Sequence, residues 1–349
     1  MRINIPPVTR GLVLLTISFT FLYALARWSV ISAATGSATP TPADLSIPYL
    51  TLVPSKSIYY IWTVLTSTFV EQNVLNLLIN TTAVLLSGRY LERAWGSKDF
   101  GIVVLIAAII PNLLVIPTYV VWGFFLRNTT RADTPIAGAI TLQAAFLVAF
   151  KQLVPEHTVS FYRVVKIRVK HFPAIFLLLN TVSGIVLGTD TALLLAWYGL
   201  ITTWIYLRFF KYQPVLGPST GGLRLRGDAS ETFAFATFFP NVLQPPIAAV
   251  CDQIYIFFCN VKIITPFTDE AIASSNEQAA VRGEGGLPTL MNQNRGARPM
   301  GKREEAERRR ALALKALDER LNAASSQASV PATDTSLQDQ KQDASTTVG

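Results

Sequence analysis

The sequence has few charged residues and almost no side chains of the kinds that bind metals or carry redox chemistry. Charged residues make up 15% of its 349 residues, against roughly 25% in soluble domains. It has two histidines, His157 and His171, and two cysteines, Cys251 and Cys259, with no Cys-x-x-Cys pair and no phosphate-binding glycine loop. These absences exclude a histidine or cysteine metal cluster and the common nucleotide-binding motifs, so we predict no metal and no cofactor.

Long apolar runs are what the sequence does have, and they are confined to its first 208 residues. Half of all residues are hydrophobic. Residues 1–208 hold 15 Lys and Arg against 7 Asp and Glu, while residues 209–349 hold 15 against 15. The net charge of +8 therefore belongs to the apolar part. A charge excess of this origin indicates membrane topology, and we predict no nucleic-acid partner.

Six apolar segments are candidates for membrane spans, since a helix needs about 20 mostly apolar residues to cross a bilayer. They are Gly11–Ile31, Trp62–Leu86, Phe100–Phe125, Ala137–Leu153, Phe172–Leu187 and Thr191–Phe209. Pro111 and Pro117 in the third segment predict a kink or a short break there. We therefore expect an all-α membrane protein with a six-helix transmembrane bundle over residues 1–210.

The basic residues between these segments predict the orientation of the bundle, because short cytosolic loops are enriched in Lys and Arg. With the N-terminus in the cytosol, 11 basic residues are cytosolic: Arg2, Arg10, Arg89, Arg93, Lys98, Lys151, Arg163, Lys166, Arg168, Lys170 and Arg208. Only 4 face the other side: Arg27, Lys56, Arg127 and Arg131. Six spans then place both termini in the cytosol. A cleaved signal peptide over the first segment is the alternative, and it leaves the remaining topology unchanged.

One glycosylation sequon agrees with this orientation. Asn128-Thr129-Thr130 lies in a loop assigned to the lumen, where such sequons are modified. Sequons also arise by chance, and this one lies close to the bilayer. Asn128 is therefore a candidate glycosylation site, whereas the match at Asn80 lies within a span and should be inaccessible.

A polar stripe interrupts the second apolar segment. Asn73, Asn76 and Asn80 are three and four residues apart, which places them on one face of a helix, and Glu71 lies close by. Polar residues inside a membrane are costly and often functional, so one interpretation is a polar pocket near the lumen. Hydrogen bonding between helices is the other interpretation, and the sequence leaves both open.

The second, fourth and sixth segments resemble the core of the rhomboid intramembrane proteases. Glu71 to Asn80, with the following Gly88-Arg89-Tyr90-Leu91-Glu92, is similar to a family pattern of two histidines and an asparagine before a Gly-x-x-Leu-Glu loop. Asn80 matches the asparagine, while Glu71 and Asn76 stand at the histidine positions. Pro135-Ile136-Ala137-Gly138 has Ala137 in place of the nucleophilic serine. In the sixth segment Ala196 stands in place of the catalytic histidine.

These replacements decide the chemistry that the resemblance implies. A serine hydroxyl is a weak nucleophile unless a base takes its proton. Position 137 is not serine and the sixth segment has no histidine, so the rhomboid mechanism cannot run. We therefore expect a rhomboid-like bundle that is not an enzyme, with degenerate catalytic positions at Asn76, Asn80, Ala137 and Ala196.

The segment after the bundle narrows the resemblance to one family. It runs Gly227-Asp228-Ala229-Ser230-Glu231-Thr232-Phe233-Ala234-Phe235-Ala236-Thr237-Phe238-Phe239-Pro240. Together with the later Glu307–Leu321 stretch, it is similar to the transmembrane protein 115 family of rhomboid-like pseudoproteases. The resemblance covers most of residues 5–325. It implies a Golgi protein in Golgi-to-endoplasmic-reticulum retrograde transport whose cytosolic tail binds the conserved oligomeric Golgi tethering complex, with an indirect effect on glycosylation.

The tail divides into four predicted segments. Residues 211–265 form a juxtamembrane segment whose apolar residues from Ile247 to Val261 repeat at helical spacing, as in an amphipathic helix lying on the membrane; a seventh span is the alternative. Residues 266–300 are predicted to be a flexible linker, because small and polar residues dominate them. Residues 301–322 favour a charged helix, and residues 323–349 favour disorder.

The charged helix carries the candidate partner-binding residues. They are Arg308, Arg309, Arg310, Leu314, Leu317 and Leu321. The leucines belong to one narrow apolar stripe, which is too short for a sustained coiled coil. A solvated helix without a partner is the alternative.

Three functions remain open at this point. The first is a non-catalytic scaffold of secretory traffic, whose bundle contacts membrane segments or lipid and whose tail recruits tethering machinery. The second is a lipid or small-molecule transporter that uses the Asn73, Asn76 and Asn80 stripe. The third is an enzyme with another mechanism, for which the sequence offers no set of residues. Formation of a homo-oligomer also stays open.

Overall fold

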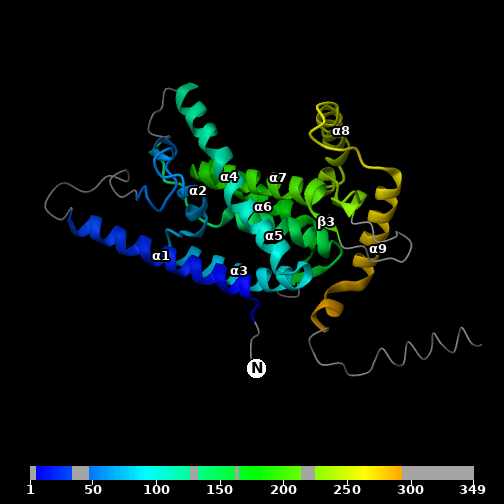
Figure 1. Cartoon of the computed structure of the whole chain (residues 1–349), viewed down its shortest axis with the longest axis horizontal. Helices are drawn as coiled ribbons and strands as arrows, with labels where there is room; N and C mark the ends of the chain where they lie inside the picture. Colours follow the sequence, from blue (N-terminus) through cyan, green and yellow to red (C-terminus); the bar gives the residue numbers. More distant parts are fainter. Residues whose placement is uncertain (1–4, 34–46, 126–132, 162–164, 214–224, 293–349) are drawn as a thin grey trace, which may run out of the picture. The chain divides into compact units, whose positions relative to one another are not determined.

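Six helices form the bundle that the computed structural model describes, within residues 5–33, 47–125, 133–161, 165–213 and 225–292 (Figure 1). They are α1 (Pro7–Ala33), α3 (Val74–Trp95), α4 (Ser97–Phe125), α5 (Ile140–Leu153), α6 (Phe172–Leu187) and α7 (Asp190–Ile205). Within these ranges, five helices are long and apolar enough to cross a membrane, and the shorter apolar α5 is not among them. The predicted all-α membrane fold is confirmed, although a count of six spans is not.

Helix α5 lies at the centre of the bundle, because it packs against α3, α4, α6 and α7. It has 14 residues, or about 21 Å at 1.5 Å per residue, so it is shorter than the bilayer core. Its closest neighbour is α7. At Gly199 of α7 a Cβ atom would lie 2.9 Å from the Cα of Thr141, so the small residue lets the two backbones approach.

The prediction for the second segment is wrong at its start. Residues 63–69 form only the short helices α2 (Thr63–Thr66) and η2 (Ser67–Phe69), and α3 begins after Asn73, which is extended. The helix continues instead through the polar Gly88-Arg89 stretch to Trp95. In the third segment no break occurs, since α4 runs without interruption through Pro111 and Pro117.

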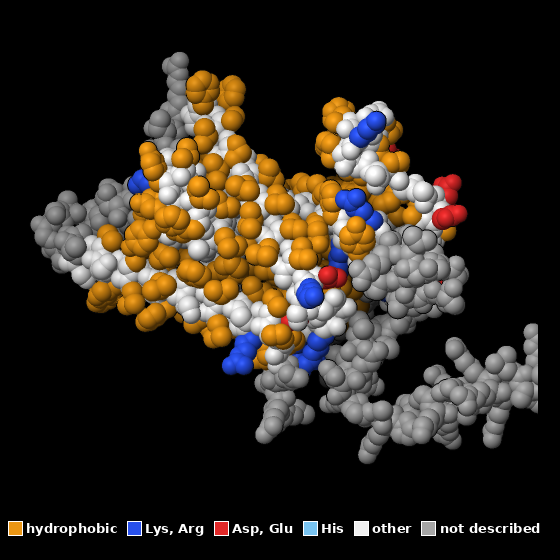
Figure 2. All heavy atoms as spheres, in the orientation of Figure 1, with side chains coloured by type: hydrophobic (Ala, Val, Ile, Leu, Met, Phe, Trp, Pro, Cys, Tyr) orange, Lys and Arg blue, Asp and Glu red, His pale blue; other side chains and the backbone are white. Residues whose placement is uncertain are grey.

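Hydrophobic side chains cover most of the face of the bundle seen in Figure 2, and Lys and Arg side chains lie at its edges. Leu78 is 61% exposed, Phe124 is 82% exposed and Ile185 is 75% exposed. Apolar surface on this scale is unfavourable in water and suits a lipid environment. A hairpin of β1 (Thr158–Phe161) and β2 (Val165–Arg168), followed by η4 (Val169–His171), joins α5 to α6.

The two ends of the bundle are named here by the ends of α1: the Pro7 end and the Ala33 end. At the Pro7 end Glu92 of α3 accepts backbone N–H groups from Val8 at 3.0 Å and Thr9 at 2.7 Å. It also accepts hydroxyl groups from Thr9 at 2.8 Å and Ser97 at 2.6 Å. The carboxylate thus satisfies free backbone donors at the start of α1 and ties that helix to α3.

The compact unit that contains the bundle extends beyond α7, to about residue 290, whereas the last candidate span ends at Phe210. The π-helix η5 (Tyr206–Phe210) ends the last span, and β3 (Tyr212–Gln213) pairs with β4 (Leu225–Arg226). The short helices η7 (Glu231–Phe233) and η8 (Phe235–Phe238) follow. Phe233 and Phe238 are buried in the cluster that contains Val103, Leu177 and Leu200 of the bundle, so the segment after α7 packs against the bundle.

Two longer helices complete the described chain. Helix α8 (Gln244–Asn260) confirms the predicted helix after the prolines, and with 17 residues it is not among the five candidate spans. Helix α9 (Asp269–Asn292) occupies most of the segment that we predicted to be a flexible linker over residues 266–300. That prediction is wrong for α9, because its side chains dock on the segment before α8. Asn128, Arg308, Arg309, Arg310, Leu314, Leu317 and Leu321 lie outside the described residues.

Candidate functional site

A buried polar network lies at the Ala33 end, around the start of α5. Glu71 is only 4% exposed. Its carboxylate accepts the backbone N–H of Ala139 at 2.9 Å and an amide N–H of Asn80, and Gln143 donates to the Asn80 oxygen. Because Ala139 is the N-cap of α5, Glu71 satisfies a free donor at the start of that helix.

Two of the degenerate catalytic positions, Ala137 and Ala196, pack in different clusters of side chains. Ala137 is half-buried, and Ala196 is fully buried in a different cluster of side chains. The α7 side chains in the cluster of Ile136, the neighbour of Ala137, are Leu194, Leu195 and Tyr198.

The predicted polar stripe is also divided. Asn80 is buried in the Glu71 network, whereas Asn76 is exposed on α3. Asn73 precedes the helix and lines a cleft beside α1. The stripe is therefore wrong as a single surface, and the transporter hypothesis loses the site on which it depended. Hydrogen bonding between elements, the other interpretation, describes Asn80.

A second polar anchor escaped the sequence reasoning. Asn112 of α4 is 2% exposed, and its amide donates to the Val64 carbonyl oxygen at 2.7 Å and to the Thr68 hydroxyl at 2.9 Å. It fixes α2 and η2 against the bundle. The sequence signal that could have identified Asn112 is an amide side chain inside an otherwise apolar run. Gln143 of α5 shows the same signal.

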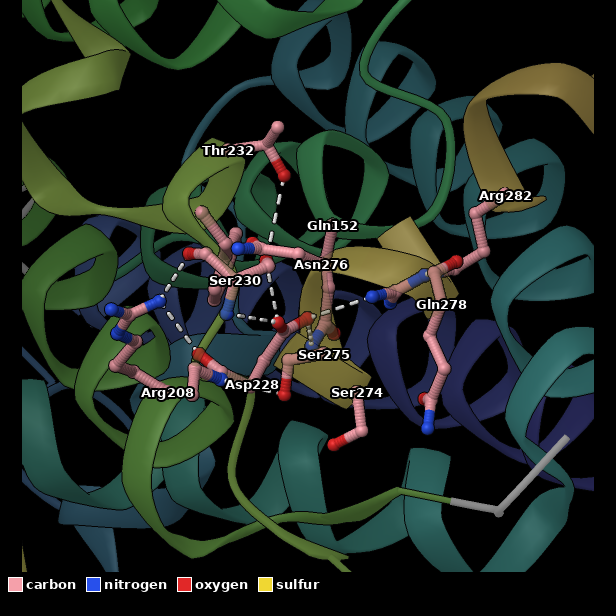
Figure 3. A network of polar contacts seen from close by, with 12 residues as sticks. Gln152, Arg208, Asp228, Ser230, Thr232, Ser274, Ser275, Asn276, Gln278 and Arg282 are labelled. Carbon is pink, nitrogen blue, oxygen red and sulfur yellow. Dashed lines mark hydrogen bonds and ion pairs between the residues drawn. The ribbon is translucent and has the colours of Figure 1, made fainter. Parts of the chain in front are cut away.

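At the Pro7 end a buried aspartate locks the segment after α7 to the bundle (Figure 3). The side chain of Asp228 is 1% exposed. Its carboxylate accepts the Gln152 amide at 2.8 Å, and the Ser230 hydroxyl and N–H at 2.6 Å and 3.1 Å. It also forms an ion pair with Arg282 of α9 at 3.1 Å. These four residues are called the Asp228 clasp.

The Asp228 carboxylate is charged at neutral pH. Burial alone would raise its pKa, but the Arg282 guanidinium and the hydrogen bonds from Ser230 and Gln152 outweigh that effect and lower the pKa below its ordinary value. The ion pair and the hydrogen bonds offset the cost of burying this charge, so the carboxylate can stabilise the fold. It holds three elements together: α5 through Gln152, the segment around Ser230, and α9 through Arg282.

The backbone around the clasp is fixed from η5. The Arg208 guanidinium donates to the carbonyl oxygens of Asp228 at 2.7 Å and Ser230 at 2.5 Å. Gly227 has φ +82°, and a Cβ atom there would lie 2.2 Å from the Arg208 carbonyl oxygen. Only glycine fits this turn, because any side chain would collide with backbone as well as strain the dihedral angle.

The aromatic residues of the same motif fill the space beneath the bundle. Phe233 and Phe238 are buried, Phe235 and Phe239 are half-buried, and Pro240 is exposed. The Trp204 indole donates to the Phe233 carbonyl oxygen at 3.0 Å. The Lys151 amine donates to the Thr237 hydroxyl at 2.9 Å and lies 3.4 Å from the centre of the Phe238 ring.

Helices α8 and α9 are attached to this motif by further contacts. On α9, Ser275 accepts the Ala229 N–H at 3.3 Å and Asn276 accepts the Glu231 N–H at 2.9 Å. Tyr255 of α8 stacks with Phe209, with ring centres 6.1 Å apart. These contacts hold α8 and α9 against the segment around Asp228. Within the described ranges, no group of three His, Cys, Asp or Glu side chains could hold a metal.

Comparison with known proteins agrees with the fold. A family described as eukaryotic integral membrane protein (DUF1751) matches residues 10–323. Human transmembrane protein 115 is 31% identical over 316 residues, covering 90% of this chain and 79% of that protein. The transmembrane protein 115 homolog of Saccharomyces cerevisiae is 30% identical over 79% of this chain and 81% of its own length. Rhomboid-like protein 19 of Arabidopsis thaliana is 29% identical over 75% and 83%.

Proposed function

This chain belongs to the transmembrane protein 115 family of rhomboid-like integral membrane proteins, and we propose that it is a non-catalytic scaffold of the Golgi membrane. In this proposal it acts in retrograde Golgi-to-endoplasmic-reticulum vesicle transport. Its N- and C-termini face the cytosol, and its tail recruits the conserved oligomeric Golgi tethering complex.

The observation that carries the non-catalytic part is the chemistry at the start of α5. Ala137 stands where a rhomboid protease has serine, and the carboxylate beside it, Glu71, is committed to Ala139 and Asn80. A carboxylate held by those structural hydrogen bonds is not placed to activate a nucleophile, and alanine offers none. Ala196 is enclosed by other apolar side chains and adds no base.

The folded segment after α7, at the Pro7 end, supports the scaffold part of the proposal. The Asp228 clasp and the phenylalanines around it hold α8 and α9 to the unit that contains the bundle. The chain continues from α9 into residues 293–349, which include the basic and leucine residues proposed to bind the partner. A folded attachment next to a tail suits recruitment, because it limits the volume that the tail searches.

Capture of the tethering complex tests this proposal. The full chain and a variant ending at Met300 would each be isolated from Golgi membranes, and the tethering subunits that accompany them quantified. We expect the subunits with the full chain only. Replacement of Leu314, Leu317 and Leu321 by serine should act like the deletion. Serine at Ala323, Ala324 and Ala328 is the control for changes outside the stripe. Equal capture by the variant ending at Met300 contradicts the tail assignment.

A further inference from the structure

A cleft separates the last turns of α1 from the start of α3 at the Ala33 end. Its volume is about 230 Å³, and its walls include Tyr23, Ala24, Arg27, Trp28 and Leu77, with the Glu71 to Val74 connection closing one side. The cleft lies outside the Asp228 clasp and outside the tail that carries the proposed function. Most of its wall is apolar, so its interior favours a hydrocarbon or glycerol group over a free polar solute.

Arg27 is the cation at this cleft. It is half-buried, and no hydrogen bond or ion pair joins its side chain to another residue in the described part of the chain. A partly buried guanidinium costs free energy until it finds an anion, and its planar donors match a phosphate or carboxylate. By contrast, Arg168, Arg208 and Arg282 at the Pro7 end bond to Glu156 or to Asp228.

The position of Arg27 along α1 selects the anion. Twenty residues separate it from Pro7, which is about 30 Å of helix at 1.5 Å per residue. That length equals the hydrocarbon thickness of a typical bilayer. With Pro7 at one boundary, Arg27 reaches the opposite headgroup layer, where lipid phosphates are the abundant anions. Trp28 is 74% exposed, as expected for an aromatic residue at a membrane interface.

The rest of the cleft completes the match. The exposed amide side chains of Gln72 and Asn73 lie at its wall, and Asn73 makes no side-chain capping bond to α3. Both amides can donate to phosphate or ester oxygens. Glu71 is engaged lower in the cleft, where its N–H donates to Thr20 at 3.1 Å. Thr20 lies seven residues before Arg27, which is about 10 Å closer to the Pro7 end along α1. Glu71 and the Arg27 guanidinium therefore lie at different depths in the cleft.

We propose that this cleft binds a glycerophospholipid of the leaflet at the Ala33 end. Arg27 holds the phosphate, Gln72 and Asn73 donate to the phosphate or ester oxygens, and the glycerol and upper acyl chain lie over Ala24 and Leu77. The site would couple α1 to α3 through a bound lipid. It requires no transport and does not depend on recruitment of a tethering complex.

Lipid titration of the purified full chain tests the proposal. Native mass spectrometry in detergent would count adducts of dioleoylphosphatidylcholine and of dioleoylglycerol, which has the same chains without the phosphate. We expect the phospholipid to bind at least about tenfold more tightly, and Arg27→Gln to weaken it about tenfold, as for loss of a charge-assisted contact. Lys56→Gln is the matched control, since it removes an exposed cation on the connection between α1 and α3.

Further arms separate the remaining outcomes. Ala24→Phe fills the cleft and should reduce phospholipid binding while Arg27 remains in place. Inorganic phosphate should not displace the lipid at millimolar concentration, because the apolar wall contributes to binding. Equal binding of dioleoylglycerol, displacement by inorganic phosphate, or equal loss in Arg27→Gln and Lys56→Gln would each overturn the proposal. Thermal unfolding without added lipid verifies that the variants fold, and an unfolded Arg27→Gln is replaced by Arg27→Lys, which keeps charge but loses the planar fork.

Discussion

Breaking the Asp228 clasp tests most sharply whether the segment after α7 is part of the folded unit. Asp228→Ala removes a carboxylate that accepts three hydrogen bonds from Gln152 and Ser230 and one ion pair from Arg282. Removing one partner of a buried ion pair costs about 3–5 kcal/mol, and the loss of three hydrogen bonds to the same carboxylate adds to that cost. The free energy of unfolding should therefore fall by about 5 kcal/mol, at the upper end of the range for breaking a buried ion pair.

The assay combines unfolding in detergent with amide hydrogen exchange of α9. In Asp228→Ala, residues 269–282 should exchange faster even where the bundle remains folded, because Arg282 no longer holds α9. Glu231→Ala is the matched control: it removes an exposed carboxylate of the same motif, and only the Glu231 N–H takes part in the contact with α9. The reasoning is refuted if Asp228→Ala and Glu231→Ala unfold alike and leave α9 equally protected.

Three further predictions follow from the geometry. Gly227→Ala should lower the free energy of unfolding by more than about 3 kcal/mol, since the added Cβ meets backbone at a positive φ. Gly101→Ala on α4, which has open space around it, should change it by less than about 1 kcal/mol. Equal melting temperatures for the two variants would contradict this. Glu71→Leu leaves the Ala139 N–H at the start of α5 and the buried Asn80 amide without an acceptor, so it should lower the free energy of unfolding by about 2–4 kcal/mol. Asn76→Leu at an exposed position should leave it unchanged. Thermal unfolding compares the two variants, and an unchanged stability of Glu71→Leu would count against the network. The folded-state pKa of Asp228 is lowered, so its contribution to the free energy of unfolding is fully present above pH of about 4 and is lost as pH falls through the folded-state pKa. Amide hydrogen exchange of α9 should therefore be constant from pH 8 to 5 after correction for intrinsic rates. A loss of protection near pH 6 would contradict the assignment.

Much of the bundle could be predicted because hydrophobicity is a strong signal for spans. The predicted Phe172–Leu187 segment matches α6 residue for residue, and the ends of α1, α4 and α7 differ by a few residues. The second segment failed at its start, because Trp62 to Val70 is apolar without being a continuous helix. Its short helices are held by tertiary contacts such as those of Asn112, which no local pattern reveals.

The site was harder to predict than the fold. The motif around Asp228 stood out in the sequence, but its role depends on Gln152 and Arg282, which lie 76 residues before it and 54 residues after it. Helix α9 was taken as a linker because small and polar residues give it little apolar surface. It is held instead by hydrogen bonds that the Ala229 and Glu231 N–H groups donate to Ser275 and Asn276. Long-range polar partners of this kind leave no periodic trace in a sequence.

The rate of Golgi-to-endoplasmic-reticulum retrograde transport tests the central proposal most directly. Cells lacking this protein would receive the full chain, the variant ending at Met300, or a full chain with Leu314, Leu317 and Leu321 replaced by serine, each at equal abundance in Golgi membranes. The account predicts that only the full chain restores transport of a retrograde reporter. Full restoration by the variant ending at Met300 would contradict it, because the membrane unit would then act without the tail.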